Sequence, residues 1–256
     1  MKKQIPNLFT LLNLFFGCLA IVAILRNGIL VRQSLEGNYI VDLPQQIVMA
    51  SVFIGLAALV DFLDGFVARL FNATSELGKQ LDSLADVVSF GVAPSLILFQ
   101  FLYLSYAGDE NGINCSQWVL YPSFILAMAA AYRLAKFNTN DAGFSYFKGI
   151  PTPAVGLLVA SFPLAYWFSE NTITFYLLTN KWFLYALIAS LSFLMVSNLP
   201  MMSLKIKNLK FNDNIQLYLL LLISVPLIIL FSWASVALIF VSYIILSLIF
   251  RNKIIH

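Results

Sequence analysis

Charged residues are scarce in this sequence. Only 11% of the 256 residues are Asp, Glu, Lys or Arg, whereas 61% are hydrophobic. A soluble globular domain has about a quarter of its residues charged, so the composition excludes an ordinary soluble domain. Apolar runs long enough to cross about 30 Å of hydrocarbon recur along the whole chain. The sequence therefore predicts one integral-membrane domain over residues 1–256.

Histidine and cysteine are almost absent as well. The one histidine, His256, is the last residue, and the two cysteines, Cys18 and Cys115, fall in different environments. A histidine general base, a histidine-rich zinc site and a disulfide are therefore not expected. Any catalytic acid or base must be a carboxylate, a lysine or a tyrosine.

Eight membrane spans are predicted, and each is expected to be helical because a lipid-embedded backbone must satisfy its hydrogen bonds within the segment. The predicted fold class is therefore all-α, a polytopic helical bundle. The first span follows the basic start MKK and is expected to be retained, since no small-residue cleavage site follows it. Residues 27–45 are polar and are expected to form a loop. The remaining spans are expected at about 46–71, 79–105, 117–137, 152–169, 182–204 and, as a pair broken near 231–235, 215–250.

Basic residues set the predicted orientation. With eight spans and the N-terminus inside, 12 of the 15 lysines and arginines fall on the inner side, and only Arg26, Arg32 and Lys181 fall on the outer side. Cytoplasmic loops of membrane proteins are enriched in these residues. Both termini are therefore expected in the cytoplasm, together with the facing ends of the second and third spans.

Four aspartates lie in the stretch DFLDGFVARLFNATSELGKQLDSLAD, residues 61–86. Isolated negative charge inside a membrane is unfavourable and needs cationic partners. Helical spacing puts Asp61 and Asp64 on one face of the second span, and Asp82 and Asp86 on one face of the third. The two spans form an antiparallel hairpin, residues 46–105, so the four carboxylates are expected to meet at one depth.

A pair of hard divalent cations suits such a site. Mg²⁺ or Mn²⁺ prefers oxygen ligands and is commonly shared between carboxylates and substrate phosphates. Two such ions could hold a pyrophosphate and align an incoming hydroxyl. The small residues Gly65, Ala68 and Gly78 either let a nucleotide approach the backbone or let the helices pack closely, and the two readings are compatible. Arg69 is either part of the site or a topology anchor.

The spacing Asp-x2-Asp-Gly-x2-Ala-Arg-x8-Gly-x3-Asp-x3-Asp, from position 61 to 86, resembles the signature of the CDP-alcohol phosphotransferases. These membrane enzymes join an alcohol to the phosphoryl group of a CDP-linked lipid or alcohol and release CMP. The resemblance implies that Asp61, Asp64 and Asp82 hold two divalent metals. It implies that Asp86 binds one metal and is also the base for the attacking hydroxyl. It further implies a CDP site lined by Asp64, Gly65, Ala68, Arg69, Gly78 and Asp82.

The flanking sequence narrows the resemblance. The segments IPNLFTLLNLFFG, SLADVVSFGVAPSL, YRLAKFN, GIPTPA and SNLPMMSLK resemble the integral-membrane bacterial phosphatidylserine synthases. That resemblance implies transfer of the phosphatidyl group from CDP-diacylglycerol to L-serine, giving phosphatidylserine and CMP. It also implies a homodimer in the cytoplasmic membrane, with the active site facing the cytoplasm. Lys136 departs from the arginine expected at its position and loses the bidentate geometry of a guanidinium.

The carboxylate of serine needs a nearby cation. Arg133 and Lys136, at the inner end of the fourth span, are the candidates, and Ser89 is expected to add a hydrogen bond close to the catalytic base. Arg133 and Lys136 could equally be membrane anchors or contacts to anionic lipids. Asn7 and Thr10 are expected to cap the start of the first span, and contact with cytidine is the alternative.

Two other functions stay open. The acceptor could be glycerol 3-phosphate or an inositol phosphate, although these phosphorylated acceptors call for a denser basic cluster than the sequence offers. An intramembrane acidic cluster could also be the ion site of a divalent-cation transporter. The acids lie near the inner end of one hairpin and the sequence has no inverted repeat, which argues against a transporter.

Overall fold

The structure is a computed structural model that describes residues 5–33, 39–70, 75–108, 112–139, 147–169, 171–202 and 214–251. Helices dominate these ranges, which confirms the predicted all-α class. The longer helices are α1 (Ile5–Arg26), α2 (Val48–Leu70), α3 (Glu76–Asp86), α4 (Ala93–Ala107), α5 (Ile125–Thr139), α6 (Thr152–Phe168), α7 (Thr172–Leu178), α8 (Lys181–Val196), α9 (Ile215–Phe231) and α10 (Ser235–Ile249).

The helices are long and apolar enough for a polytopic membrane protein. Within the described ranges five helical segments could cross a membrane, and a sixth span results if the bent pair α7 and α8 counts as one. The predicted number of eight spans is not confirmed. The shorter helix α6 and the separate helices α9 and α10 account for the difference, because none of the three reaches 18 residues by itself.

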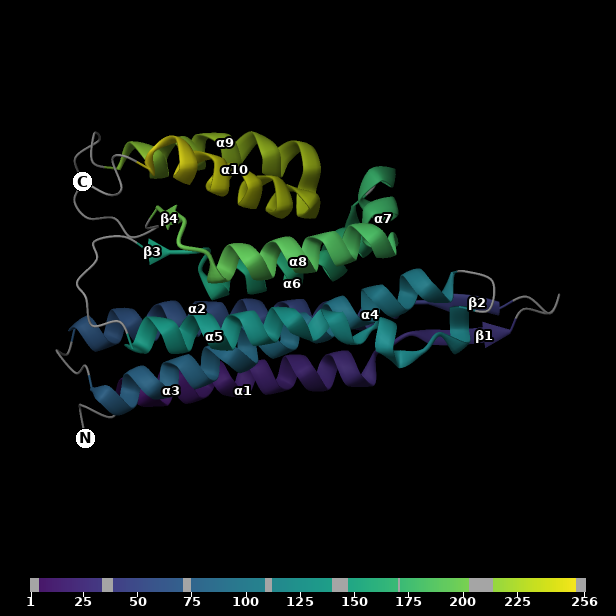
Figure 1. The fold of residues 1–256 in the computed structure, drawn as a ribbon, viewed down its shortest axis with the longest axis horizontal. Helices are drawn as coiled ribbons and strands as arrows, with labels where there is room; N and C mark the ends of the chain where they lie inside the picture. Colours follow the sequence, from purple (N-terminus) through teal and green to yellow (C-terminus); the bar gives the residue numbers. More distant parts are fainter. Residues whose placement is uncertain are drawn as a thin grey trace.

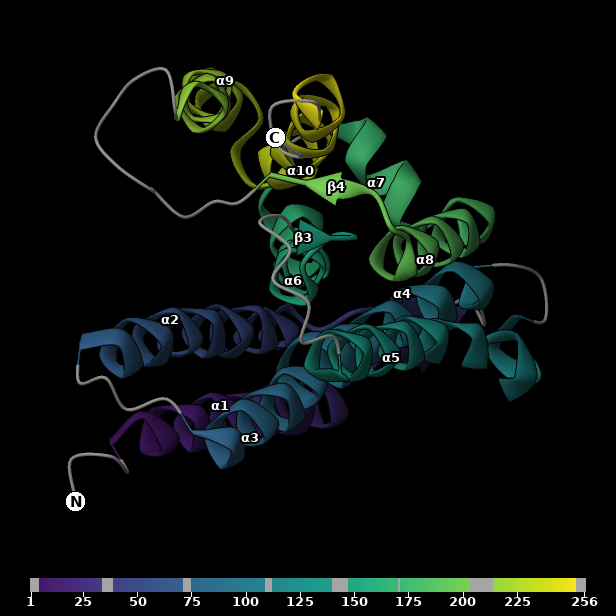
Figure 2. The same ribbon diagram turned by 60° about the vertical axis from the view of Figure 1, so that its left-hand side comes forward.

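The helices form three layers. The first layer contains α1 to α5, the second contains α6 and α8, and the third contains α9 and α10 (Figures 1 and 2). The start of α1 and the end of α10 lie at the same end of the bundle as the start of α3, whereas α7 and a short hairpin lie at the other end (Figure 1). This places the end of α2 and the start of α3 on the same side as the start of α1 and the end of α10, as the predicted topology requires.

A π-helical turn, η3 (Val87–Val92), joins α3 to α4 in one continuous helical segment. The start of this segment is fixed by Ser75, whose Oγ accepts a hydrogen bond from the N–H of Gly78 at 3.0 Å. Phe90, in the π-helical turn, is fully buried against α6. A Cβ added at Gly156 of α6 would lie 2.9 Å from the Cβ of Phe90, so α6 can approach only because position 156 is a glycine.

Helix α1 approaches the same π-helical turn from the other side. The Oγ of Ser89 donates a hydrogen bond to the backbone carbonyl of Asn13 at 3.1 Å. A Cβ added at Gly17 would overlap Ser89. These contacts hold α1 against α3 and η3, the elements that carry two of the four aspartates.

Two details of the sequence prediction change. The predicted loop at 27–45 contains two antiparallel strands, β1 (Leu30–Gln33) and β2 (Tyr39–Asp42), with Val31 opposite Val41. Their β-branched and aromatic residues favour a hairpin over a loop. The sixth span was predicted to reach 204, but α8 ends at Val196 because the chain turns to pair β4 (Pro200–Met201) with β3 (Phe147–Lys148).

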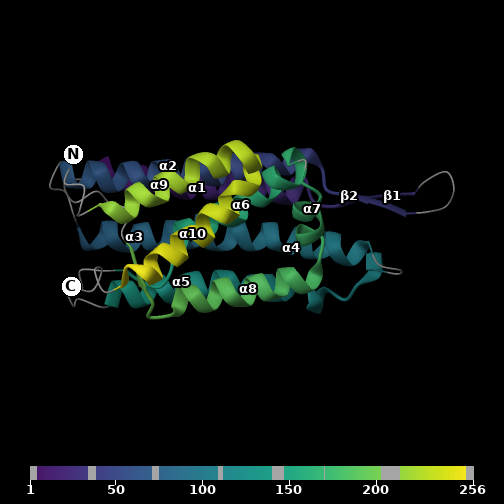
Figure 3. The same cartoon turned by 90° about the horizontal axis from the view of Figure 1, so that it is seen from above.

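The predicted break near 231–235 is confirmed. The 3-10 turn η8 (Ser232–Ala234) separates α9 from α10, and Ser232 has a positive φ of 46°. The two helices fold back beside each other, and α10 lies over α6 (Figures 1 and 3).

The close approach of α6 to η3 makes Gly156 sensitive to substitution. We predict that Gly156→Ala lowers the free energy of unfolding by about 1–3 kcal/mol, the usual effect of overpacking. Gly55→Ala is the matched control, since no described atom lies within 4 Å of a Cβ at that helical position. This control should leave stability unchanged or raise it by up to about 1 kcal/mol. Thermal unfolding in detergent measures both, and equal melting temperatures would contradict the packing argument.

Candidate active site

Three of the four predicted carboxylates form one cluster. Asp61 and Asp64 lie on α2, and Asp82 lies on α3. One carboxylate oxygen of each residue lies within 4.8 Å of the corresponding oxygens of the other two. Asp64 is buried, whereas Asp61 and Asp82 are partly exposed. Oxygen donors gathered this closely are the ligands that Mg²⁺ and Mn²⁺ prefer. The residues present therefore fit the predicted metal site.

Asp86 lies outside this group of three. It is one helical turn beyond Asp82 on α3 and is buried. Its Oδ1 accepts a hydrogen bond from Nδ2 of Asn13 at 3.2 Å. The Asp86 carboxylate is also close enough to Asp61, Asp82 and Asp64 to be repelled by their charges. Asp86 thus lies near the cluster and is hydrogen-bonded to Asn13. Metal binding by Asp86 stays a prediction.

Helix α1 supplies hydrogen bonds to both halves of the carboxylate set. Asn13 donates to Asp86, as described above. The Oγ1 of Thr10 donates a hydrogen bond to Oδ2 of Asp64 at 2.9 Å. The same Oγ1 lies 3.2 Å from the backbone oxygen of Pro6. Thr10 and Asn13 are both buried. The predicted capping role of Thr10 is wrong, because Thr10 lies in the second turn of α1 and binds across to α2.

Sequence reasoning missed this role of α1, although a signal was present. Asn7, Thr10 and Asn13 recur every third residue in an otherwise apolar span, and this spacing puts them on one helical face. Polar side chains on one face of a membrane helix point to a polar partner in the bundle interior. In the structure Asn7 also lies on this side of the site, since a Cβ added at Gly78 would be 3.1 Å from its Oδ1.

The small residues of the motif have different surroundings. No described atom lies within 4 Å of a Cβ added at Gly65, which is exposed, so helix packing does not explain this glycine. At Gly78, in contrast, an added Cβ would crowd Asn7 and Ser75. Helix α2 includes Ala68 and Arg69, but their side chains lie outside the described part of the structure. Their predicted roles stay predictions.

Arg133, on α5, interacts with residues of three other helices. Its Nη1 donates a hydrogen bond to the Oγ1 of Thr152, at the start of α6, at 3.0 Å. Its charge interacts with Tyr243 of α10 and with Asp86 of α3. The Nε of Arg133 is buried and has no hydrogen-bond partner within the described residues. This nitrogen is a donor that an anionic ligand could use.

Tyr243 is a further polar residue that sequence reasoning missed. It is buried, and its hydroxyl donates a hydrogen bond to the backbone carbonyl of Met202 at 3.1 Å. No local pattern in the apolar final span marks this tyrosine, so only the tertiary structure places it beside Arg133.

The other two predicted acceptor residues are less central. Ser89 is fully buried, and its hydroxyl proton is engaged by the carbonyl of Asn13. The Nζ of Lys136 donates a hydrogen bond to Oδ1 of Asn198 at 3.1 Å in an exposed position. The charge of Arg133 therefore acts on Asp86. Ser89 instead bonds to α1, and Lys136 bonds to the segment after α8. Contact of either residue with a substrate stays a prediction.

The sequence profile of the CDP-alcohol phosphatidyltransferase family matches residues 3–193. The chain belongs to this family. The matched residues include all four aspartates and Arg133, the elements of the site described above. As a member of the CDP-alcohol phosphatidyltransferase family the chain is a transferase embedded in a membrane, which leaves the transporter alternative without support.

Three relatives carry the same name, CDP-diacylglycerol--serine O-phosphatidyltransferase. The protein from Helicobacter pylori (strain ATCC 700392 / 26695) is 36% identical over 228 residues, which cover 87% of this chain and 80% of that protein. The protein from Saccharomyces cerevisiae is 37% identical over 165 residues, 61% of this chain and 52% of that protein. The protein from Bacillus subtilis is 30% identical over 164 residues, 64% of this chain and 77% of that protein.

Proposed function

We propose that this chain transfers the phosphatidyl group of CDP-diacylglycerol to the hydroxyl of L-serine, releasing CMP. The observation that carries the proposal is the cluster of Asp61, Asp64 and Asp82 at the α2–α3 hairpin, with carboxylate oxygens within 4.8 Å of one another. The family match and the names of the relatives support serine as the acceptor.

Asp61, Asp64 and Asp82 are the residues that would hold two divalent cations, Mg²⁺ or Mn²⁺, with Asp86 as a further ligand. Such cations, when bound, neutralise the charge of the pyrophosphate and stabilise the transition state of phosphoryl transfer. The open surface at Gly65 supports a place for the nucleotide beside this cluster. The proposed CDP site consists of Asp64, Gly65, Ala68, Arg69, Gly78 and Asp82.

Asp86 is the proposed general base. The serine oxygen attacks the phosphorus that carries the diacylglycerol, a new P–O bond forms, and the P–O bond to CMP breaks. Asp86 accepts the proton of the serine hydroxyl. The hydrogen bond from Asn13 fixes the orientation of the Asp86 carboxylate, and its burial keeps bulk water from competing as a proton donor.

Arg133 is the proposed partner of the serine carboxylate. Its Nη1 donates to Thr152, and its buried Nε is a donor without a partner among the described residues that the serine carboxylate could use. Its charge also acts on Asp86, so a serine bound to Arg133 would have its hydroxyl on the side of the base. Lys136 and Ser89 complete the proposed acceptor site at a greater distance from the reacting atoms.

We also infer a single domain over residues 1–256 that works as a homodimer in the cytoplasmic membrane, with the carboxylates facing the cytoplasm. The distribution of bases supports this orientation. Lys79, in the first turn of α3, lies at the end of the bundle where α1 starts and α10 ends, whereas α8, which begins with Lys181, starts at the opposite end (Figure 1). An excess of basic residues on the side of the carboxylates is what the positive-inside rule expects.

The first test is a product analysis. Purified protein with Mn²⁺ and CDP-diacylglycerol should form phosphatidylserine and CMP when L-serine is added, and no lipid product with glycerol 3-phosphate or an inositol phosphate. Asp86→Asn should lower kcat by about 10²–10⁴-fold, the usual contribution of a general base. Asp42→Asn, in β2 at the far end of the bundle, is the matched control and should keep full activity. A lipid product with another acceptor, or CMP release without any acceptor, would contradict the serine assignment.

The second test separates substrate binding from structure at Arg133. Arg133→Ala should raise the KM for serine by about 10–100-fold, because a charged hydrogen bond contributes about 1.5–3 kcal/mol. The KM for CDP-diacylglycerol should change little, and Arg133→Lys should recover part of the serine affinity. Lys181→Ala, at the opposite end of the bundle, is the control. If the KM for serine stays the same in Arg133→Ala, the assignment of Arg133 to serine is wrong.

A further inference from the structure

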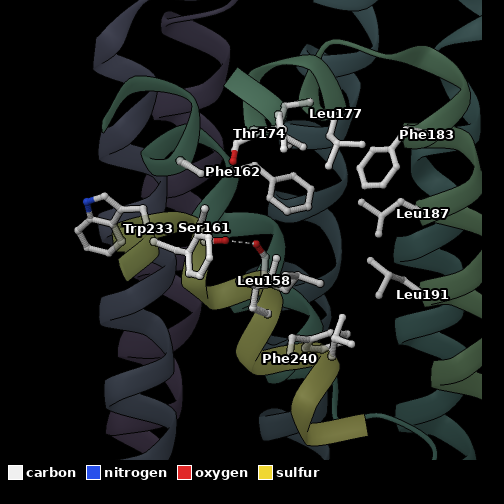
Figure 4. A pocket seen from close by; sticks show the side chains of 18 of the residues that line it. Leu158, Ser161, Phe162, Thr174, Leu177, Phe183, Leu187, Leu191, Trp233 and Phe240 are labelled. Atoms are coloured by element: carbon white, nitrogen blue, oxygen red, sulfur yellow. Dashed lines mark hydrogen bonds between the residues drawn. The ribbon is translucent and has the colours of Figure 1, made fainter. Parts of the chain in front are cut away.

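An apolar cavity of about 440 Å³ lies between α6, α7, α8 and α10. Leu158 and Phe162 of α6, Leu191 of α8 and Phe240 of α10 point into it from different sides (Figure 4). The cavity extends to α7, at the end of the bundle opposite the start of α3 and the carboxylate cluster (Figure 1). Its volume is in the range of about 300–1,000 Å³ that is typical of ligand sites.

Three of the polar side chains that line the cavity are engaged with nearby backbone. The Oγ of Ser161 donates to the carbonyl of Leu158 at 2.6 Å, and the Oγ of Ser190 donates to the carbonyl of Leu187 at 3.0 Å. The Oδ1 of Asn171 accepts from the N–H of Ile173 at 2.9 Å. A cavity lined in this way offers water few hydrogen bonds and favours a hydrocarbon occupant.

The length of the cavity matches one lipid chain. The lining residues on α8 run from Phe183 to Leu194, a distance of about 16 Å at the rise of an α-helix. This is close to half of the roughly 30 Å hydrocarbon core of a bilayer. An acyl chain of a phospholipid spans one such half, so the site has the length of a single chain in one leaflet.

The level of the cavity in the membrane is indicated by aromatic residues. Trp182 and Tyr176 are 73% and 67% exposed at the α7 end of the bundle, and Trp233 lines the cavity while being 45% exposed. Tryptophan and tyrosine gather at the membrane–water interface. The cavity therefore begins at the level of lipid headgroups and runs toward the centre of the bilayer.

We propose that this cavity binds one acyl chain of a membrane phospholipid from the leaflet opposite the carboxylate cluster. The position distinguishes this lipid from a substrate whose headgroup would lie at the α2–α3 hairpin. The bound chain fills the space between α10 and the α6–α8 layer, and so holds α10, which carries Tyr243 beside Arg133. The proposal does not depend on the identity of the acceptor alcohol.

Native mass spectrometry of the full chain, purified in a mild detergent, tests this proposal by counting retained phospholipids. Leu191→Trp fills the cavity from α8, where Leu191 is 3% exposed, and Phe193→Trp is the matched control because Phe193 is 72% exposed on the same helix. Wild type and Phe193→Trp should retain one phospholipid. Leu191→Trp should weaken retention by more than about tenfold, because excluding even two or three methylenes from an apolar site has that effect.

A second readout keeps the test decisive if Leu191→Trp fails to fold. In wild type, a phosphatidylethanolamine with a diazirine at the middle of one acyl chain should crosslink to the buried residues Leu158 and Leu191. Ala237→Phe, which fills the cavity from α10, should abolish these crosslinks. Crosslinks confined to exposed residues such as Phe193 would overturn the proposal. So would equal lipid retention in all variants, or a change of oligomeric state in Leu191→Trp without loss of lipid.

Discussion

The gathering of negative charge inside an apolar bundle is the constraint on which the rest of the structure depends. Asp61, Asp64 and Asp82 bring carboxylate oxygens within 4.8 Å of one another, and Asp86 stands one turn away. Such a set is unfavourable unless cations or hydrogen-bond donors compensate it. Helix α1 supplies donors from Thr10 and Asn13, so α1 must pack directly against the α2–α3 hairpin. Because α1 must pack this closely, Gly17 leaves room for Ser89, and Ser89 donates a hydrogen bond to the backbone of α1.

The second and third layers extend this arrangement to Arg133. Its guanidinium is held by Thr152 of α6 and lies near Tyr243 of α10, so the most C-terminal helix of the described structure contributes to the surroundings of a residue on α5. A chain with few charges thus places Arg133 where its charge acts on the buried carboxylate of Asp86. Contacts of α6 and α10 that are far from the α2–α3 hairpin are therefore relevant to the geometry of the site.

The sequence predicts those parts of the site that depend only on helical phase. The positions of Asp61, Asp64 and Asp82 follow from i, i+3 and i, i+4 spacing in two adjacent spans, and the structure confirms that they meet. The roles of Thr10, Ser89 and Tyr243 depend on contacts between distant segments, which no local pattern specifies. The π-helical turn after Asp86 also changes the angular phase of the residues that follow it, so Ser89 bonds to α1. The β1–β2 hairpin was missed because its polar surroundings resemble a loop.

The central claim is that α2 and α3 hold a cation site whose carboxylates are positioned by α1. Titration of Mn²⁺ followed by electron paramagnetic resonance tests it most directly, on wild type, Asp64→Asn, Thr10→Val and the control Asp42→Asn. Wild type and Asp42→Asn should bind Mn²⁺ equally well, and Asp64→Asn should lose most of the binding. Thr10→Val, which keeps every carboxylate but removes the hydroxyl that donates to Asp64, should weaken the affinity by about tenfold. Unchanged Mn²⁺ affinity in both Asp64→Asn and Thr10→Val would contradict the account.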